Sequence, residues 1–174
     1  MKKRLDLEDA TLRGMTGRDL PALRALLHDT EVRRFLCDDE ILPDDWFLET
    51  LERSDVLDPR GLGLWAIEAP DGAFLGMAGL RPLGESGTSH ADLVGAVQLT
   101  IAVGPPAWGT GLARRASERL LQHGFEDLGL PRVIAIVDDP NERSHALIQR
   151  LGFTRIGVDT GPAYSQTVYV LSPD

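Results

Sequence analysis

The stretch from residue 93 to residue 128 constrains the fold most, because three patterns in it fix the order of the elements. Leu93–Val103 has the apolar character of a strand, which must stop before Pro105-Pro106 because proline cannot donate to a ladder. The turn Gly109-Thr110-Gly111 comes next, and Leu112–Leu128 then carries apolar residues at helical spacing. A strand, a glycine-rich turn and a long helix are therefore expected to follow one another directly.

Helical patterns dominate before this stretch, and strands alternate with helices after it. A capping box at Thr16-x-x-Asp19 starts a helix with Leu20, Leu23, Leu26 and Leu27 on one side, Thr30–Leu36 is a second helix, and a third follows Pro43 with Phe47, Leu48 and Leu51 inside. The other strands are Ala10–Arg13, Leu64–Ala69, Phe74–Leu83, Arg132–Val137, Phe153–Val158 and Tyr164–Leu171, and Asn141–Leu151 is the last helix. These elements predict an α+β fold, one domain over residues 1–174, with a mixed, mostly antiparallel sheet of about seven strands flanked by helices.

Composition narrows the classes of function. The net charge of −9 argues against a nucleic-acid partner, whose binding depends on basic patches. No apolar run approaches the ~20 residues of a membrane span, and no signal peptide is recognised, so no membrane partner and a cytoplasmic location are expected. Cys37 is the single cysteine, which is too few for a zinc site, and no metal is expected.

The glycine turn is a candidate anion site. N–H groups at a helix start point the same way and meet the positive end of the helix dipole. Gly109 and Gly111 allow the backbone to come close to a bulky phosphate, and Ala113 is small. A Walker loop would have Gly-Lys-Ser/Thr where Leu112-Ala113 stands, and a dinucleotide fingerprint would come at the first strand–helix junction. An ordinary tight turn is the alternative interpretation.

A second motif follows the next strand. Asp138-Asp139-Pro140-Asn141-Glu142-Arg143-Ser144 opens the last helix, which ends at Leu151-Gly152-Phe153, and Asn141 is a natural N-cap. Taken with Trp-Gly-x-Gly-x-Ala at 108–113, this spacing resembles the GNAT superfamily of N-acetyltransferases. The motifs look like its branch of ribosomal-protein N-terminal acetyltransferases, as do Thr11-Leu12-Arg13 and Asp19-Leu20-Pro21-Ala22-Leu23. The resemblance covers about residues 8–171.

The resemblance implies the acyl-CoA N-acyltransferase fold and direct attack of a primary amine on acetyl-CoA in a ternary complex. The exposed edge of the strand at 101–103 would bind the pantetheine arm as an extra strand, and an N–H near Val103 would polarise the thioester carbonyl. The implied cofactor-binding residues are Ile101, Ala102, Val103, Trp108, Gly109, Thr110, Gly111, Leu112, Ala113, Arg114 and Asn141. Arg115 or Arg143 could also screen the adenosine phosphates. The implied catalytic residues are Ser144 and Asn141, at the thiol end.

The resemblance also bears on partners. Proteins of this kind act on protein N-termini, polyamines, aminoglycosides and small amines, so the implied acceptor is a small-molecule amine or a basic protein N-terminus. Homodimers are common in the branch. Between Asp29 and Asp58, eleven acidic residues oppose three arginines, so this segment carries −8 of the net charge of −9. In resembling proteins this region walls the acceptor side, where an acidic rim would attract a cationic amine; a merely solvated surface is the alternative.

Two positions depart from the resemblance. Many members have a proton-donating tyrosine where this chain has Ile148, and the branch often has a glutamate where this chain has Gln98. Ser144 is then the expected proton donor, although its hydroxyl could equally bond back to the helix start. Glu68, Glu85, Asp92 and His90 are alternative bases between which the sequence does not choose. These departures keep a second function open, a catalytically idle acyl-CoA-binding module, and a structural domain without a ligand is a third.

Overall fold

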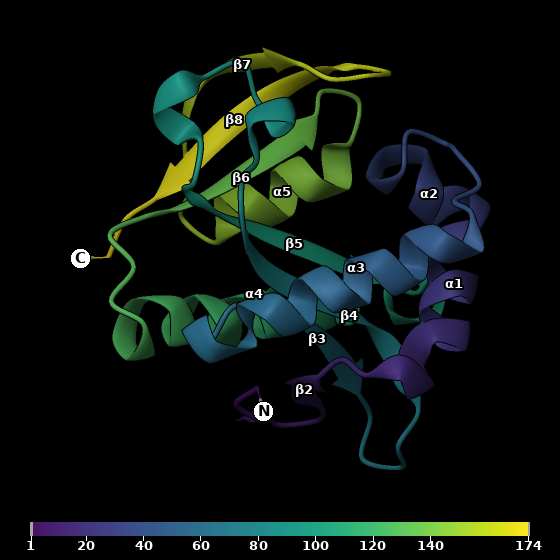
Figure 1. Ribbon diagram of the computed structural model, residues 1–174. Helices are drawn as coiled ribbons and strands as arrows, with labels where there is room; N and C mark the ends of the chain where they lie inside the picture. The colour runs from purple at the N-terminus through teal and green to yellow at the C-terminus, as the bar shows by residue number, and fades with distance from the viewer. Residues whose placement is uncertain (1, 174) are drawn as a thin grey trace.

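The computed structural model describes residues 2–173 and contains one eight-stranded sheet between two layers of helices (Figure 1). The strand order across the sheet is β1-β2-β3-β4-β5-β6-β8-β7. The strands are β1 (Leu5–Asp6), β2 (Thr11–Gly14), β3 (Gly63–Glu68), β4 (Phe74–Pro82), β5 (Val97–Val103), β6 (Val133–Asp138), β7 (Thr154–Thr160) and β8 (Ser165–Leu171). Within residues 2–173 the neighbouring strands pair antiparallel except β5 and β6, which are parallel. This arrangement confirms the predicted α+β class and the mostly antiparallel sheet.

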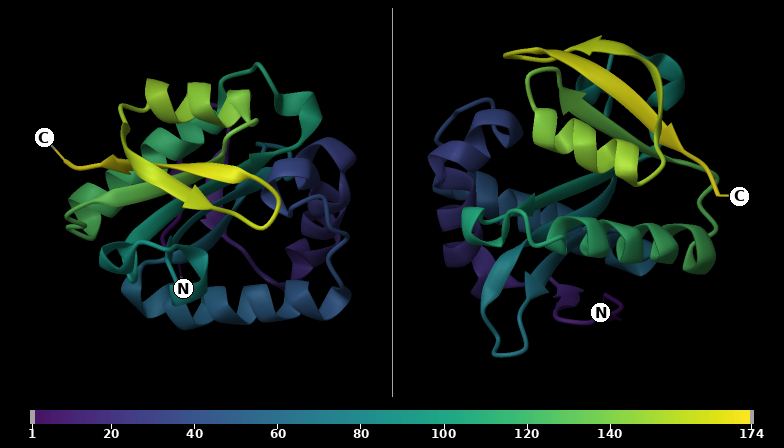
Figure 2. Two further views of the ribbon diagram at one scale, coloured as in Figure 1. Left: turned by 90° about the horizontal axis from the view of Figure 1, so that it is seen from above. Right: turned by 180° about the vertical axis from the view of Figure 1, so that it is seen from behind.

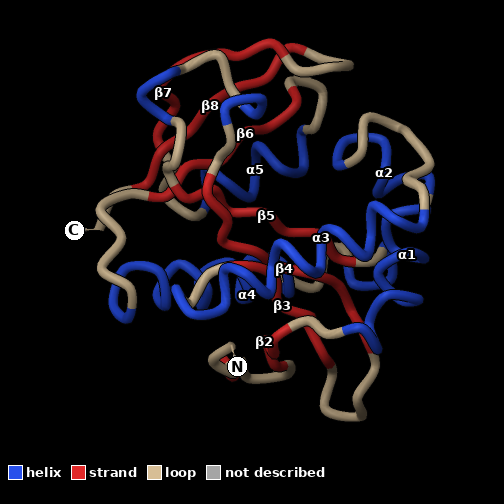
Figure 3. Tube along the Cα trace, viewed as in Figure 1, coloured by secondary structure: helices blue, strands red, loops and turns tan. Residues whose placement is uncertain are grey.

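The helices cover both faces of the sheet (Figure 2). One layer contains α1 (Leu20–His28), α2 (Thr30–Leu36) and α3 (Asp44–Leu57), and the other contains α4 (Leu112–Gln122) and α5 (Glu142–Arg150). Short 3₁₀ turns lie at Gly17–Asp19, Asp58–Arg60, Glu85–Gly87, Ala91–Leu93 and Pro105–Ala107, and a π-helical turn at His123–Asp127 extends α4. Figure 3 shows how these helical segments enclose the strands on both sides.

Strand alternation divides the core between the two layers. Val97, Leu99 and Val103 of β5 pack with Leu112, Ala116 and Leu120 of α4. Ala102 of β5 packs instead with residues of α1, α2 and α3, such as Leu23, Val32 and Phe47. Because successive side chains point to opposite faces of a strand, each residue of β5 and β6 can be assigned to one layer or the other.

The sheet opens between β5 and β6. Their parallel pairing comprises Val97 with Val133 and Gln98 with Ile134. Beyond Gln98, β5 continues its pairing with β4 as far as Val103, whereas the end of β6 pairs with β8. The two strands therefore separate toward their carboxyl ends, which leaves the edge of Ile101–Val103 without a partner strand on the β6 side.

Four details differ from the sequence prediction. The two-residue strand β1 is an additional strand beside β2. Residues Ala91–Leu93 form a 3₁₀ turn, so β5 begins at Val97 instead of at Leu93. Leu48 is 53% exposed on the outer side of α3, not inside. The α-helical part of the predicted helix 112–128 ends at Gln122 and continues as the π-helical turn.

Candidate active site

A cleft with a volume of about 1540 Å³ follows the opening between β5 and β6. Its walls come from the ends of these two strands, from α2, from the amino end of α4 and from the length of α5. The cleft is therefore bordered by helices of both layers, and the separated ends of β5 and β6 lie between these helices. Ten residues that the sequence assigned to the site line it: Ile101, Ala102, Val103, Trp108, Gly109, Gly111, Ala113, Arg114, Asn141 and Ser144.

The glycine turn before α4 has the conformation that its composition predicts. Gly109 and Gly111 have left-handed φ angles of 76° and 80°, which side-chain-bearing residues avoid. Trp108 closes the turn onto the preceding strand, because its Nε1 donates to the Val103 carbonyl at 2.9 Å. Gly109, Gly111 and Ala113 line the cleft, so the start of α4 borders it, and a helix start is a position that favours phosphate.

Two predicted residues of the turn do not line the cleft. The Thr110 hydroxyl donates to the Ala107 carbonyl at 2.6 Å, and Leu112 is 4% exposed in the core beneath α4. The backbone of these residues shapes the turn, whereas their side chains serve its closure and packing. Arg115 also lies outside the lining, since it pairs with Asp9 and donates to the Thr110 carbonyl. Arg143 lies in the lining, 3.9 Å from the centre of the Trp108 ring.

Asn141 and Ser144 form a compact cap at the start of α5. The Asn141 Oδ1 accepts from the Ser144 backbone N–H at 3.2 Å, and its Nδ2 donates to the Ser144 hydroxyl oxygen at 3.1 Å. The serine hydroxyl thus receives a hydrogen bond at its oxygen and keeps its own hydrogen available for donation. Ile148 is buried one turn further along α5, at 4% exposure.

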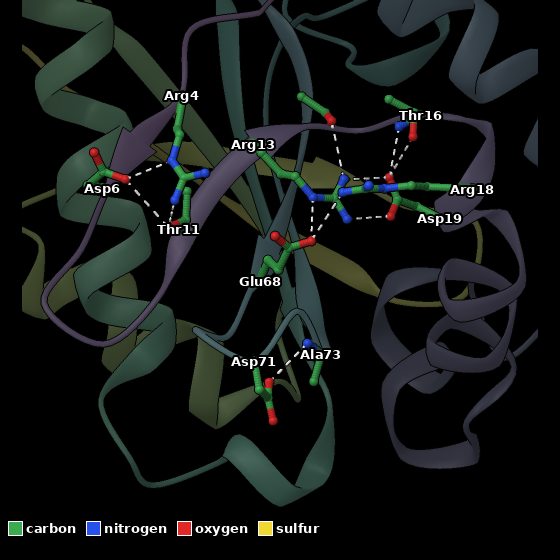
Figure 4. A network of polar contacts seen from close by, with 11 residues as sticks. Arg4, Asp6, Thr11, Arg13, Thr16, Arg18, Asp19, Glu68, Asp71 and Ala73 are labelled. Carbon is green, nitrogen blue, oxygen red and sulfur yellow. Dashed lines mark hydrogen bonds and ion pairs between the residues drawn. The ribbon is translucent and has the colours of Figure 1, made fainter.

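The four alternative bases named from the sequence all lie outside the cleft lining. Glu68 forms ion pairs with Arg13 and Arg18. Figure 4 shows this group beside the Asp19 carboxylate. The His90 ring bonds to the Val158 carbonyl at 2.7 Å, while Glu85 belongs to an exposed 3₁₀ turn. Asp92 lies in the next such turn, where its carbonyl accepts from Arg132. None of the four therefore lines this cleft, and Glu85 comes nearest to it through Gly87 of the same turn.

Asp138 is a titratable residue of the cleft to which the sequence analysis assigned no role. It ends β6, is 5% exposed and lines the cleft. Its Oδ1 accepts from Gln166 Nε2 at 2.9 Å, whereas its Oδ2 has no hydrogen-bond partner within residues 2–173. Burial raises the pKa of this carboxyl, and the negative charges of Asp38 and Asp139 raise it further against the opposing Gln166 hydrogen bond.

The acidic segment 29–58 contributes to the cleft through its first part. Glu31 and Asp38 line it from α2 and the turn that follows, together with Arg34. No residue of α3 lines it, and Asp44 pairs with Arg24 on the outer surface. The acidic rim inferred from the sequence is therefore confined to α2 and the adjoining turn.

The structure also bears on metal and membrane binding. No group of three or more His, Cys, Asp or Glu side chains within residues 2–173 is arranged to hold a metal ion. Over the same residues, no helix combines the length and the apolar character that crossing a membrane requires.

Comparison with known proteins identifies a family. Residues 9–154 match the family described as the acetyltransferase (GNAT) domain. The chain is 25% identical over 173 residues to an uncharacterized N-acetyltransferase, YoaA, of Bacillus subtilis (strain 168), which covers 95% of this chain and 94% of the relative.

Two solved structures have the same fold. RimL, a ribosomal L7/L12 alpha-N-protein acetyltransferase in complex with coenzyme A, gives a TM-score of 0.78 at 15% identity over 98% of both chains. The spermidine N-acetyltransferase of Vibrio cholerae, in complex with CoA and spermine, gives 0.75 at 19% identity over 95% of this chain and 96% of the other. These two neighbours use different acceptors, so the shared fold does not select one.

Proposed function

Because this chain belongs to the GNAT family of acetyl-CoA-dependent N-acetyltransferases, we propose that it transfers acetyl to a primary amine bound on the α2 side of the cleft. One observation supports the proposal most: the unpaired edge of β5 and the glycine turn before α4 border the same cleft. A strand edge can bind the amide groups of a pantetheine arm, and a helix start can bind the pyrophosphate at its end. The two parts together fit acyl-CoA better than a free phosphate.

In the proposed reaction, acetyl-CoA and the amine approach from different sides of the sheet. Ile101–Val103 would hold the thioester end, with a backbone N–H near Val103 stabilising the oxyanion that develops on the carbonyl. An amine entering beside α2 would then reach the thioester through the opening between β5 and β6. Attack forms the C–N bond, the C–S bond breaks, and the thiolate needs a proton.

We assign the chain to the ribosomal-protein N-terminal acetyltransferase branch on its Asn141-x-x-Ser144 and Leu151-Gly152-Phe153 motifs. The acceptor is then a protein N-terminus, a polyamine or a small amine, and we propose the cytoplasm as the compartment. Acetyl-CoA consumption should be measured with a panel containing a basic N-terminal peptide, spermidine and a neutral primary amine. Turnover with at least one acceptor is expected. Binding of acetyl-CoA without turnover on every amine would favour an idle acyl-CoA-binding module.

Ser144→Ala should lower kcat about tenfold while acetyl-CoA affinity changes little, because a proton donor to the thiolate acts mainly in the transition state. The hydroxyl lines the cleft, and its oxygen is held by Asn141, which leaves its hydrogen free to donate. The measurement is kcat across pH together with the Kd of acetyl-CoA. If Ser144→Ala kept full turnover at every pH, the serine would serve only in the hydrogen bonds with Asn141 at the start of α5.

A cationic acceptor should be attracted by the acidic residues of α2. Glu31→Lys should lower kcat/KM for spermidine about threefold to tenfold at low ionic strength, and the wild-type value should fall as salt rises past ~0.1 M, where the Debye length is about 10 Å. Asp44→Lys is the matched control, because Glu31 and Asp44 both stand in the first turn of a helix but Asp44 lies outside the cleft. A kcat/KM that is flat in salt and equal in both variants would contradict steering.

A further inference from the structure

We infer that Asp138 is the general base of the proposed function, and that it takes the proton from the ammonium group of the acceptor. An aliphatic amine is protonated at neutral pH and cannot attack until it loses a proton. The four acidic or imidazole groups considered from the sequence lie outside the cleft, and Gln98 cannot accept a proton. A carboxylate on the acceptor side is therefore the group that the reaction still requires.

The sheet geometry gives Asp138 this position. Gln98 pairs with Ile134, so the two residues share a face, and alternation adds Thr100 and Ala102 of β5 to it. The same alternation places Asp138 on the face of Ile134 and Ile136, whereas Val137 packs with the core under α4 and α5. Asp138 thus belongs to the side of α2, where the amine enters, at the strand end where β5 and β6 have separated.

The carboxylate of Asp138 is not explained by the stability of the fold. Its Oδ1 has one partner, Gln166, while Oδ2 is buried without a hydrogen bond from any residue between 2 and 173. Leaving such an atom without a donor destabilises a folded protein, and native structures contain few examples. A small rotation of the carboxylate would turn this oxygen toward the cleft that Asp138 lines, where an ammonium group would supply the missing donor. The unpaired oxygen is therefore the atom to which we assign the acceptor nitrogen.

The surrounding charges suit a base that must both attract a cation and bind its proton. Asp38 from the turn after α2 and Asp139 from the strand end raise the pKa of Asp138, in addition to burial. On α5, His145 Nε2 lies 3.2 Å from the Asp138 carbonyl oxygen. The other charged groups lining this cleft are Glu31, Arg34, Arg81, Arg114, Glu142, Arg143 and Arg150. A raised carboxyl pKa brings the base closer to neutral pH, where proton transfer is most efficient.

The proposed step balances without a further reactant. The Asp138 carboxylate accepts one proton from R–NH₃⁺, and the neutral amine attacks the thioester carbon. The C–N bond forms, the C–S bond breaks, and the second proton lost by nitrogen ends on the thiolate. The proton on Asp138 then passes to solvent, so the products are the acetamide, CoA–SH and one released proton.

Asp138→Asn should lower kcat/KM about a hundredfold at pH 7, the lower end of what a positioned base contributes. The deficit should shrink as pH rises toward the amine pKa, because the acceptor then loses its proton unaided. The Kd of acetyl-CoA should stay within about twofold, and Tm should rise by about 2–4 °C because a buried charge is removed. Asp139→Asn is the matched control, an exposed neighbour outside the cleft whose Oδ1 accepts from Thr167. It should keep most of the wild-type activity at pH 7, and its pH profile should move slightly toward lower pH, because the Asp139 charge no longer raises the pKa of Asp138.

The outcomes separate the two levels of inference. If the wild type acetylates an amine and Asp138→Asn matches it in kcat/KM and pH profile, the role of Asp138 is overturned alone. If the wild type binds acetyl-CoA but acetylates no amine, the proposed function falls and the role of Asp138 falls with it. Should Asp138→Asn fold poorly, Asp138→Glu tests the same point, because it keeps a carboxylate and should retain more activity than Asp138→Ala at neutral pH. Equal activity of these two variants would also overturn the proposal.

Discussion

Asp19→Ala should lower the free energy of unfolding by about 3 kcal/mol, because it breaks a largely buried ion pair and removes an acceptor from a helix start. The Asp19 side chain is 4% exposed and that of Arg13 15%. Two hydrogen bonds join them, Nη1 to Oδ2 at 2.8 Å and Nη2 to Oδ1 at 2.7 Å (Figure 4). Asp19 Oδ2 also accepts from the Thr16 backbone N–H at 2.8 Å. Breaking a buried pair costs about 3–5 kcal/mol, and the low end applies because Glu68 stays beside Arg13.

Asp6→Ala is the matched control for this ion pair. Asp6 of β1 pairs with Arg4, which directly precedes the same strand, but the two side chains are 74% and 65% exposed, so the loss should stay below about 1 kcal/mol. Urea denaturation of the three proteins measures both differences. Equal losses in the two variants would contradict the argument from burial.

The same pair predicts the pH dependence of stability. Burial opposes ionisation of Asp19, but the hydrogen bonds from Arg13 and Thr16 hold its pKa below the ordinary value. Because the folded pKa is the lower one, this contribution is complete above the unfolded pKa of about 3.9 and is lost as pH falls through the folded value. The difference between wild type and Asp19→Ala should therefore be constant near neutral pH and shrink in acid.

Local signals account for the parts of the fold that the sequence predicted. The hairpin β3–β4, the stop of β5 before Pro105 and the cap at Asn141 each depend on residues adjacent in the chain. The strand β1 was missed because two residues are too few to show an alternating pattern, and Leu5 pairs with Leu12 of β2. Leu48 was placed inside by helical spacing, but α3 covers the sheet with Phe47 and Leu51 and leaves Leu48 outside.

The same distinction between local and long-range determinants applies to the candidate site. The glycine turn and Asn141 could be predicted because their conformations are set within a few residues. The environment of Asp138 could not, since it depends on the separation of β5 from β6 and on Gln166, 28 residues away. Glu68 was a plausible base in the sequence, but its partner Arg13 lies 55 residues earlier and meets it only across β2 and β3. Long-range pairing thus decides which carboxylate is free.

Gly111→Val should weaken CoA binding at least tenfold, a free-energy loss of about 1.4 kcal/mol or more. Gly111 stands just before α4 with a φ of 80°, which a β-branched residue adopts only at considerable strain. A Cβ there would also lie 2.8 Å from Arg115 Nη1, the group that donates to the Thr110 carbonyl. A valine would relieve both conflicts by moving the turn, and the N–H groups at the start of α4 would then no longer converge on a phosphate.

Gly72→Val separates this loss from a general effect of strain. Gly72 also has a left-handed φ, 89°, with open space around its Cβ position, but it lies in the hairpin turn between β3 and β4, outside the cleft. Both variants should lose roughly 1–3 kcal/mol of stability, and Gly111→Val alone should lose affinity for CoA. Calorimetric titration with CoA measures the affinities, and thermal unfolding confirms that both variants fold. Unchanged affinity in a folded Gly111→Val protein would remove the glycine turn from the CoA site, and equal losses in both variants would attribute the effect to strain rather than to phosphate binding.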